Sequence, residues 1–479
     1  PPEATSEAPE TTRAPPPTPI PLRSDVTVEE FLGQAPNVPS DELGPGLRQF
    51  VRGEFDTGDV ALMLAGSVSS LLMITPGLLF FYGGLLGHRN VPALMVRYLL
   101  LAALLSMMWV LGTYSLAFAR NVRSHDASAG EIHPADPKDH QGNPFIGGLD
   151  HVAFRGLNSQ VGADSALYPL RRPSDRISHL LFMAYQMMFF IAVPAPLVVA
   201  LTDRLRASGI ALFVLLWGTL VYAPLAYWVW GGGWHAAALD TGGGIPAHVG
   251  VGFAALAAAV VLGKRENCDD ESPPPNRLGY LGLGAALFWG GALIQNASRA
   301  FATDGFADNA FVTTHLAACA GLIGWTGMEW LSRGKAGLTG LCAGSVAGLI
   351  AIASGSGFVA PPSSIVIGIV GGSACFCAHA SVKRWFSGNG FLEVFVLHAV
   401  AGVLGVLLTG VFATASVRGY DGEGKLINGL LVGDASRLAD QAFAVSSAAA
   451  LALAGTLIVL LVVRVTTGFC PAERDGDGQ

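Results

Sequence analysis

The chain has 479 residues, of which 51% are hydrophobic and only 13% are charged, and its mean hydropathy is +0.49. A water-soluble domain carries about a quarter charged residues, so this composition excludes that class and indicates a membrane protein. The formal net charge is −7, and residues 1–57 hold most of it, since 4 arginines against 10 acidic residues give −6 there. The nearly neutral remainder offers no basic surface for a nucleic acid.

Residues 1–57 are expected to form an extracellular or periplasmic appendage. The opening PPEATSEAPETTRAPPPTPIPL is rich in proline and poor in large apolar residues, which predicts a flexible tail. The following SDVTVEEFLGQAPNV carries a helix-start pattern, with Ser24 or Asp25 before VEEFL. We therefore expect an acidic, Pro-rich tail that contains one short helix.

Residues 58–465 are predicted to be an all-α membrane domain. Apolar stretches of about twenty residues, the length that crosses a ~30 Å hydrocarbon layer, recur eleven times. Irregular backbone is not tolerated against lipid, so each stretch is expected to be a helix. The predicted spans are 60–82, 98–119, 178–202, 207–230, 245–263, 278–298, 309–328, 336–357, 361–382, 394–417 and 441–463.

The connections between spans predict the orientation in the cell (cytoplasmic or inner) membrane. Basic residues follow the odd-numbered spans, for example Arg204 and Arg206 after the third. The positive-inside rule therefore places the N-terminus outside and a short tail, residues 466–479, inside. The long loop at 120–177 must then lie outside despite its basic residues, because its length weakens the rule and acidic residues balance it.

The spans suggest two inverted five-helix repeats plus one extra helix, an arrangement that places a substrate path where the repeats meet. The fifth span, HVGVGFAALAAAVVLG, and the tenth, HAVAGVLGVLLTGVFA, both begin with a histidine that small residues follow. His248 and His398 are therefore expected to meet at the repeat interface. Ionisable groups within a membrane are costly and mark pathways, and a buried pair is expected to hold at most one proton. For His315 and His379 a plain hydrogen bond to a neighbouring helix is expected.

Five stretches, in order along the chain, resemble the ammonium transporters of the Amt/Rh family, close to their bacterial Amt branch. They are ITPGLLFFYGGLLGHRNV (74–91), YQMMFF (185–190), VWGGGWHAAALDTGGG (229–244), GMEWLSRGKAGLTGLCAGSVAGL (327–349) and VFVLHAVAGVLGVLLTGVFA (394–413). The resemblance implies a homotrimer in which each subunit has its own pore. It also implies a cytosolic nitrogen-regulatory partner of the PII type at the inner face.

The resemblance assigns roles to particular residues. It implies that His248 and His398 line the pore, that Phe189 is the first of two gate phenylalanines, and that Trp230 belongs to an aromatic cation site. Tyr185 and Gln186 match neighbours of that gate. For Asp240, two interpretations stand side by side: a carboxylate at the start of the fifth helix, which its positive end stabilises, and a residue that holds the backbone of the outer vestibule.

Transport of ammonium or ammonia is the function that these residues predict. An unpaired cation costs tens of kcal/mol to bury in hydrocarbon in the Born limit, and a cation–π contact returns only about 0.5–2 kcal/mol. We therefore expect ammonium to lose its proton at the outer mouth and ammonia to pass the two imidazoles. The proton is expected to take a separate, histidine-assisted route. Potassium has no proton to lose, so it is excluded.

The outer vestibule departs from the family pattern. Gln295 stands where the second gate phenylalanine is expected, and Arg299 replaces a serine of the cation site. The two are four residues apart, so they share a helix face that is expected to border the vestibule. A fixed charge there repels a cation about 6 Å away by roughly 3 kcal/mol at a dielectric constant of 20. The alternative is that Arg299 extends outward to the membrane surface.

A second departure precedes the tenth-span histidine. The position that matches Asp240 in the other repeat holds Gly390 here in place of an acidic residue. Glu393 nearby is an imperfect substitute. The departures leave two other functions open: a poorly conducting ammonium sensor or receptor with the same fold, and a transporter of another small substrate, including an anion. Nothing indicates an enzyme, a cofactor or a metal site, and the six cysteines suggest no disulfide framework.

Overall fold

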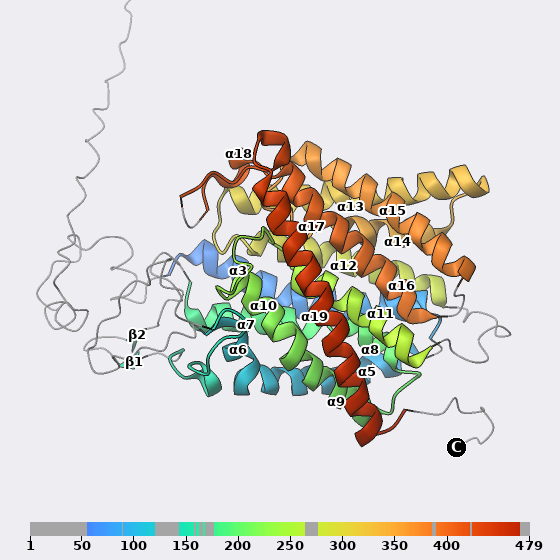
Figure 1. The fold of residues 1–479 in the computed structure, drawn as a ribbon, viewed down its shortest axis with the longest axis horizontal. Coiled ribbons are helices and arrows are strands. Elements are labelled where there is room, and N and C mark those ends of the chain that lie inside the picture. Colours follow the sequence, from blue (N-terminus) through green and yellow to red (C-terminus); the bar gives the residue numbers. More distant parts are fainter. Residues whose placement is uncertain are drawn as a thin grey trace, which may run out of the picture. The chain divides into compact units, whose positions relative to one another are not determined.

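Helices make up nearly all of the described chain (Figure 1). The structure is a computed structural model, and it describes residues 55–88, 90–119, 143–157, 160–161, 166–167, 177–263, 276–385, 389–421 and 424–469. These residues all fall in one compact unit. The short helix expected near Ser24 lies outside the described residues.

The first half of the helical unit follows the first five predicted spans. Several of its long helices are continuous but contain a π-helical segment, labelled η. The elements are α3 (Thr57–Ser69), η2 (Ser70–Ile74), α4 (Thr75–Leu85), α5 (Val91–Met108), η3 (Trp109–Thr113), α6 (Tyr114–Phe118), α7 (His179–Ala192), α8 (Ala195–Leu201), α9 (Ala207–Trp217), η5 (Gly218–Tyr222), α10 (Ala223–Trp230), η6 (Gly244–Val249) and α11 (Gly250–Leu262).

The second half contains longer uninterrupted helices. Its elements are α12 (Arg277–Ser298), α13 (Gly305–Arg333), α14 (Leu338–Ile352), α15 (Pro361–Trp385), α16 (Gly390–Phe395), η7 (Val396–Val400), α17 (Ala401–Phe412), α18 (Ala415–Arg418) and α19 (Ser436–Thr466). Short 3₁₀ turns, η4 (Val152–Phe154) and η8 (Leu430–Val432), lie in connections. Two paired strands, β1 (Gln160–Val161) and β2 (Ala166–Leu167), fall within the predicted outer loop.

Nine helices of the described chain are long and apolar enough to cross a membrane. This confirms the predicted all-α membrane fold but not the predicted count of eleven spans. The two predicted spans that are not among the nine are α13 and α14. With 15 residues, α14 is shorter than a full crossing, and α13 has the length but carries more polar residues along it.

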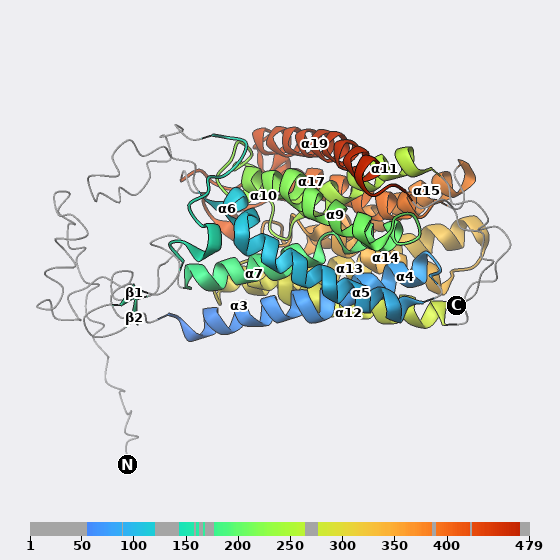
Figure 2. The same cartoon turned by 90° about the horizontal axis from the view of Figure 1, so that it is seen from below.

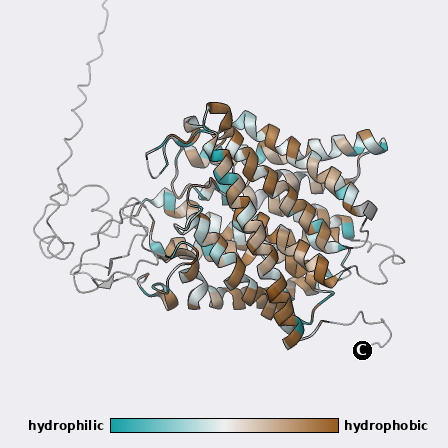
Figure 3. Cartoon of the chain, viewed as in Figure 1, coloured by the Kyte–Doolittle hydropathy of each residue, from teal (hydrophilic) through white to brown (hydrophobic). Residues whose placement is uncertain are grey.

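Most helices lie side by side with their axes roughly along one direction, whereas α19 crosses them obliquely (Figures 1 and 2). The last helix, α19, packs on α9, α11 and α17, which come from both halves of the chain. Hydrophobic residues dominate the helices, and hydrophilic residues gather mainly at helix ends and connections (Figure 3). Large apolar side chains such as Leu99, Leu100 and Val465 are exposed on α5 and α19, as expected of surfaces that contact lipid or another subunit.

Proline explains two of the π-helical segments. Pro76 and Pro224 stand at the second position of α4 and α10, directly after η2 and η5. Proline has no backbone N–H and cannot donate the α-helical bond to the residue four positions earlier. The preceding turn therefore widens to the π-helical pattern, which in other proteins occurs mostly as a single turn within an α-helix.

Glycines bring α11 and η7 into close contact. A Cβ atom at Gly252 would lie 2.3 Å from the backbone nitrogen of Ala399, and one at Gly402 would lie 3.1 Å from the Cβ of His248. Each glycine is four residues after the histidine of its own helix and faces the histidine region of the other helix. This reciprocal packing supports the predicted match between the fifth and tenth spans, because small residues let membrane helices approach closely.

We expect Gly252→Ala to destabilise the protein and the matched Gly279→Ala to leave its stability unchanged or raised. The new methyl group at 252 meets backbone of a neighbouring helix, an overpacking that costs about 1–3 kcal/mol or more. At Gly279 in α12 a Cβ meets nothing within 4 Å, and alanine favours the helix. Thermal unfolding in detergent compares the two variants, and equal melting temperatures would contradict the close approach.

Candidate functional site

Two histidines from opposite halves of the chain meet inside the bundle. His248 lies in η6 and His398 in η7, and their Nδ1 atoms are 3.0 Å apart. The ring centroids are 5.1 Å apart, and His398 is 2% exposed. A contact of this length between ring nitrogens requires one proton between them, donated by one imidazole and accepted by the other.

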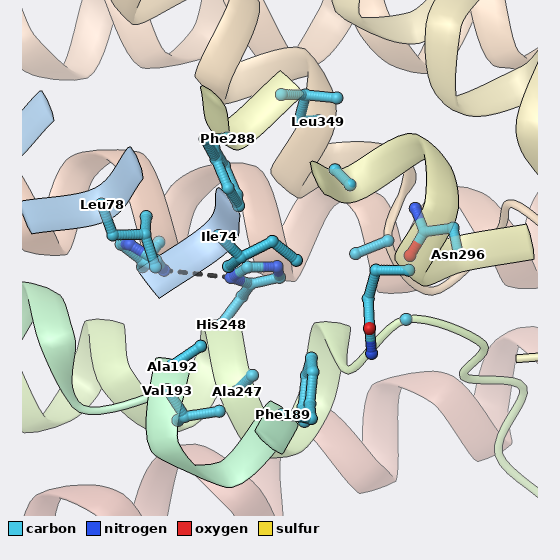
Figure 4. Close-up of a pocket in the computed structure, with 15 residues that line it drawn as sticks. Ile74, Leu78, Phe189, Ala192, Val193, Ala247, His248, Phe288, Asn296 and Leu349 are labelled. Atoms are coloured by element: carbon cyan, nitrogen blue, oxygen red, sulfur yellow. Dashed lines mark hydrogen bonds between the residues drawn. The ribbon is translucent and has the colours of Figure 1, made fainter. Parts of the chain in front are cut away.

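The histidines border a narrow, mostly apolar pocket, shown in Figure 4 with the hydrogen bond of His248 drawn as a dashed line. Phe189 and Asn296 lie at some distance from the histidine, and Leu78, Ala192 and Ala247 line the walls. Apart from the histidines, the polar side chains that line the pocket are Gln295 and Asn296. Such a lining suits a small uncharged molecule, because it offers no compensation for a buried charge.

Tyr82 extends the histidine pair on the side of His398. Its ring is stacked on that imidazole at 5.7 Å between centroids, and the side chain is fully buried. Neither the Tyr82 hydroxyl nor the His398 Nε2 has a hydrogen-bond partner within the described protein. The residue lies in the conspicuous FFYGGL stretch, but sequence reasoning did not single it out, since only tertiary packing brings it to the tenth span.

Asp240 holds the backbone where the histidine-bearing helix begins. Its Oδ1 accepts hydrogen bonds from the backbone N–H groups of Gly243 and Gly244 at 2.7 and 2.9 Å, and its Oδ2 accepts one from Ile245 at 2.7 Å. Gly243 has φ of 92°, a left-handed conformation that favours glycine. Burial raises the pKa of the Asp240 carboxyl, and the three backbone bonds oppose that rise. The helix-start and backbone-holding interpretations therefore describe the same contacts.

The aromatic residues expected at the outer gate lie together. Phe189 and Trp230 are in edge-to-face contact, with centroids 6.0 Å apart. The indole Nε1 of Trp230 donates to the backbone oxygen of Asp240 at 3.0 Å. The Tyr185 hydroxyl donates to the backbone oxygen of Gln295 at 3.1 Å. Trp230 is thereby connected to the segment just before η6, and Tyr185 to the last turn of α12.

Arg299 occupies the space between these rings. The carbon at the centre of its guanidinium group lies 4.3 Å from the Trp230 ring centroid, 4.4 Å from Phe189 and 5.3 Å from Tyr185. Its Nη1 donates to Gln186 Oε1 at 3.2 Å. Because the residue is only 5% exposed, the alternative that it extends outward to the membrane surface is wrong. Gln186, expected only as a gate neighbour, anchors this charge.

Gln295 lies where a gate phenylalanine was expected, but its side chain is engaged elsewhere. The residue is 2% exposed and lines the pocket. Its side-chain amide contacts the Ser70 hydroxyl at 2.5 Å. No phenylalanine therefore stacks on Phe189 from this position of α12, and the ring of Phe189 faces the guanidinium of Arg299 instead.

Glu393 does not take the place that Asp240 has in the other repeat. The side chain of Asn389 caps α16 by accepting from the N–H of Phe391 at 3.1 Å. Glu393 instead bonds His379 of α15, with Oε2 and Nδ1 2.7 Å apart. Because Asn389 already caps the first turn of α16, the Glu393 carboxylate pairs with the neighbouring helix instead.

His315 and His379, for which a hydrogen bond to a neighbouring helix was expected, lie apart from the pocket lining. His379 bonds a neighbouring helix through Glu393, as expected. His315 contacts Cys319 of its own helix at 3.7 Å and lies 5.5 Å from the Trp289 ring. In the described residues no group of three histidine, cysteine or acidic side chains is placed to hold a metal ion.

A bundle of membrane-crossing helices around a narrow pocket with paired imidazoles defines the class of a membrane transport protein for a small molecule. The chain belongs to the Ammonium Transporter Family, whose model matches residues 61–475. The ammonium transporter of Bacillus subtilis (strain 168) is 38% identical over 408 residues, which cover 85% of this chain and 92% of that protein.

Solved structures share the fold. The crystal structure of Saccharomyces cerevisiae Mep2 superposes with a TM-score of 0.73 at 28% identity, covering 88% of this chain and 91% of that one. A structure named Sensor Amt Protein has a TM-score of 0.70 at 18% identity and covers 86% and 95% of the two chains. At that identity the second likeness concerns the fold alone.

We expect Asp240→Ala to destabilise the protein more than Asp240→Asn does. Alanine leaves three buried N–H groups without an acceptor, at about 1–3 kcal/mol each, whereas asparagine keeps an oxygen for Gly243 and Gly244. The control is Asp308→Ala in the first turn of α13, an exposed acid worth about 0.3–1 kcal/mol there. Thermal unfolding in detergent ranks the variants, and equal losses for Asp240→Ala and Asp308→Ala would contradict the capping role.

Proposed function

We propose that this protein moves ammonium nitrogen across the membrane by passing ammonia between His248 and His398. The observation that carries the proposal is the direct contact of two imidazoles from matched helices, 3.0 Å apart beside an apolar pocket. A paired imidazole offers both a donor and an acceptor to a small polar molecule without adding a net charge. Membership in the ammonium transporter family supports the same substrate.

The charge of ammonium is lost before the pocket. The lining carries no carboxylate, so an ammonium ion within it would be an unpaired buried cation. Ammonium therefore gives up its proton at the outer mouth, where Phe189 closes the pocket and Asp240 holds the backbone of η6. Potassium cannot lose its charge in this way, and the same barrier excludes it.

The assembly and placement follow from the resemblance and from the distribution of basic loops. The protein is proposed to be a homotrimer in the cell membrane, with its N-terminus outside and its C-terminus inside. A cytosolic nitrogen-regulatory protein of the PII type is the proposed partner at the inner face. The relatives are named as transporters, which supports a function other than enzymatic catalysis.

A second candidate function is that of an ammonium sensor that conducts poorly. The buried guanidinium of Arg299 favours it, because a resident cation among the gate aromatics hinders the approach of another cation. In that case a separate protein receives the signal at the inner face. Rapid ammonia flux through the purified protein would exclude this candidate, whereas another small substrate would leave the flux at background.

We expect His248→Ala and His398→Ala each to reduce ammonia flux to the rate of protein-free liposomes. Each removes one partner of the imidazole pair, so the pocket loses the paired donor and acceptor that are proposed to bind ammonia. Proteoliposomes that contain a pH-sensitive dye are mixed rapidly with ammonium chloride, and the interior pH is followed. The matched control is His315→Ala, a histidine of α13 outside the pocket, which keeps the parent rate. Parent rates in both pore variants would refute the proposal.

A further inference from the structure

The aromatic cage at the outer gate, formed by Tyr185, Phe189 and Trp230, is already occupied by the protein itself. The guanidinium of Arg299 lies 4.3–5.3 Å from all three ring centroids and is almost completely buried. We propose that Arg299 is a resident cation that excludes ammonium ion from this cage and selects ammonia, so that transport moves no net charge. The inference rests on the proposed passage of ammonia past the histidines.

The cage has room for one cation. Three rings already face the guanidinium, so a second cation would have to stay outside the cage at about 6 Å or more. Repulsion at that distance lowers its occupancy on the order of a hundredfold at an effective dielectric constant of 20. A single aromatic contact does not offset an effect of that size. An arginine side chain stays charged in proteins, so the exclusion persists at every physiological pH.

No carboxylate is in direct contact with this charge, and the electrostatic interaction of Arg299 with Asp240 is the smallest of the effects on that carboxyl group. Arg299 forms no ion pair within 4.0 Å among the described residues, and its Nη1 bonds the neutral amide oxygen of Gln186. Both oxygens of Asp240, the acid at the start of η6, already accept backbone N–H groups. The positive charge is therefore held by aromatic faces and one amide, and it acts on any ion that approaches Phe189 from the cage.

The hydrogen-bonding groups of Arg299 also favour ammonia over ammonium. The Nε and Nη2 atoms of Arg299 are buried and have no hydrogen-bond partner among the described residues, and a guanidinium group only donates. Ammonia has a lone pair and accepts such a bond, whereas ammonium has four N–H groups and no lone pair. The entrance therefore binds the neutral form and rejects the charged form.

The proton remains on the outer side. Because Arg299 keeps ammonium out of the cage, one N–H bond of ammonium breaks at the outer mouth, just outside the cage. The proton passes to water or buffer there, the nitrogen keeps the electron pair, and the separate proton route expected from the sequence is not used. Ammonia then crosses Phe189 and the histidine pocket and takes up a proton from the inner solution. No charge crosses with it, so the interior becomes alkaline and no current flows.

The test compares Arg299→Gln with Arg299→Lys in proteoliposomes. Two readouts are taken after an ammonium jump: interior pH by rapid mixing, and charge movement by electrophysiology on a solid-supported membrane. The parent and the lysine variant, which retains the charge, are expected to show alkalinisation without current. The glutamine variant is neutral and of similar length, so ammonium can occupy its cage and release a proton there to the separate, histidine-assisted route. Its ammonium-evoked current is therefore expected to rise at least tenfold. Adding Trp230→Leu to that variant is expected to remove the new current.

Three results would overturn the inference. A parent current as large as that of Arg299→Gln would show that the resident charge does not exclude ammonium. Alkalinisation that appears only after Arg299 is replaced would show that the residue blocks the entrance to ammonia as well and does not discriminate between ammonia and ammonium. Equal currents in the lysine and glutamine variants would make its charge irrelevant. Loss of alkalinisation in His248→Ala tests the ammonia path separately, so failure of the pore proposal and failure of the Arg299 proposal are distinguishable.

Discussion

The constraint on which this structure depends is that a charge cannot be left without compensation inside a bundle of apolar helices. The pocket meets it by pairing two imidazoles that share a proton over 3.0 Å. That contact exists because α11 and η7 touch backbone to backbone, with Gly252 against Ala399 and Gly402 against His248. Side chains at these glycines would separate the helices and, with them, the two rings.

The positive charge near the pocket obeys the same constraint by other means. Arg299 is buried without a carboxylate partner, and three aromatic rings and the amide of Gln186 surround it. A serine and a phenylalanine at positions 299 and 295 would leave the cage open to an external cation. Arg299 fills the cage instead, while the side chain of Gln295 accepts a hydrogen bond from Ser70. We propose that this changes the form of the substrate that the entrance favours, while the pore behind it stays the same.

Much of the fold was predictable from hydropathy, since a segment that crosses lipid must be both apolar and helical. The helices follow the predicted spans closely, for example α9 and α10 over 207–230. The predicted span at 336–357 was too long, because only α14 (338–352) is helical there and residues 353–358 form turns. The π-helical turns that carry His248 and His398 were not predicted, since hydropathy does not distinguish π-helical from α-helical pairing.

The sequence by itself determined the class of the protein, the matched histidines and the unusual residues at 295 and 299, because composition, spacing and motif are local properties of the chain. Only the tertiary structure decided where the arginine goes. A position at the end of α12 is compatible both with a side chain that reaches water and with one that folds inward. The second prevails because Trp230, Phe189 and Tyr185, from two other helices, present their ring faces to the same point.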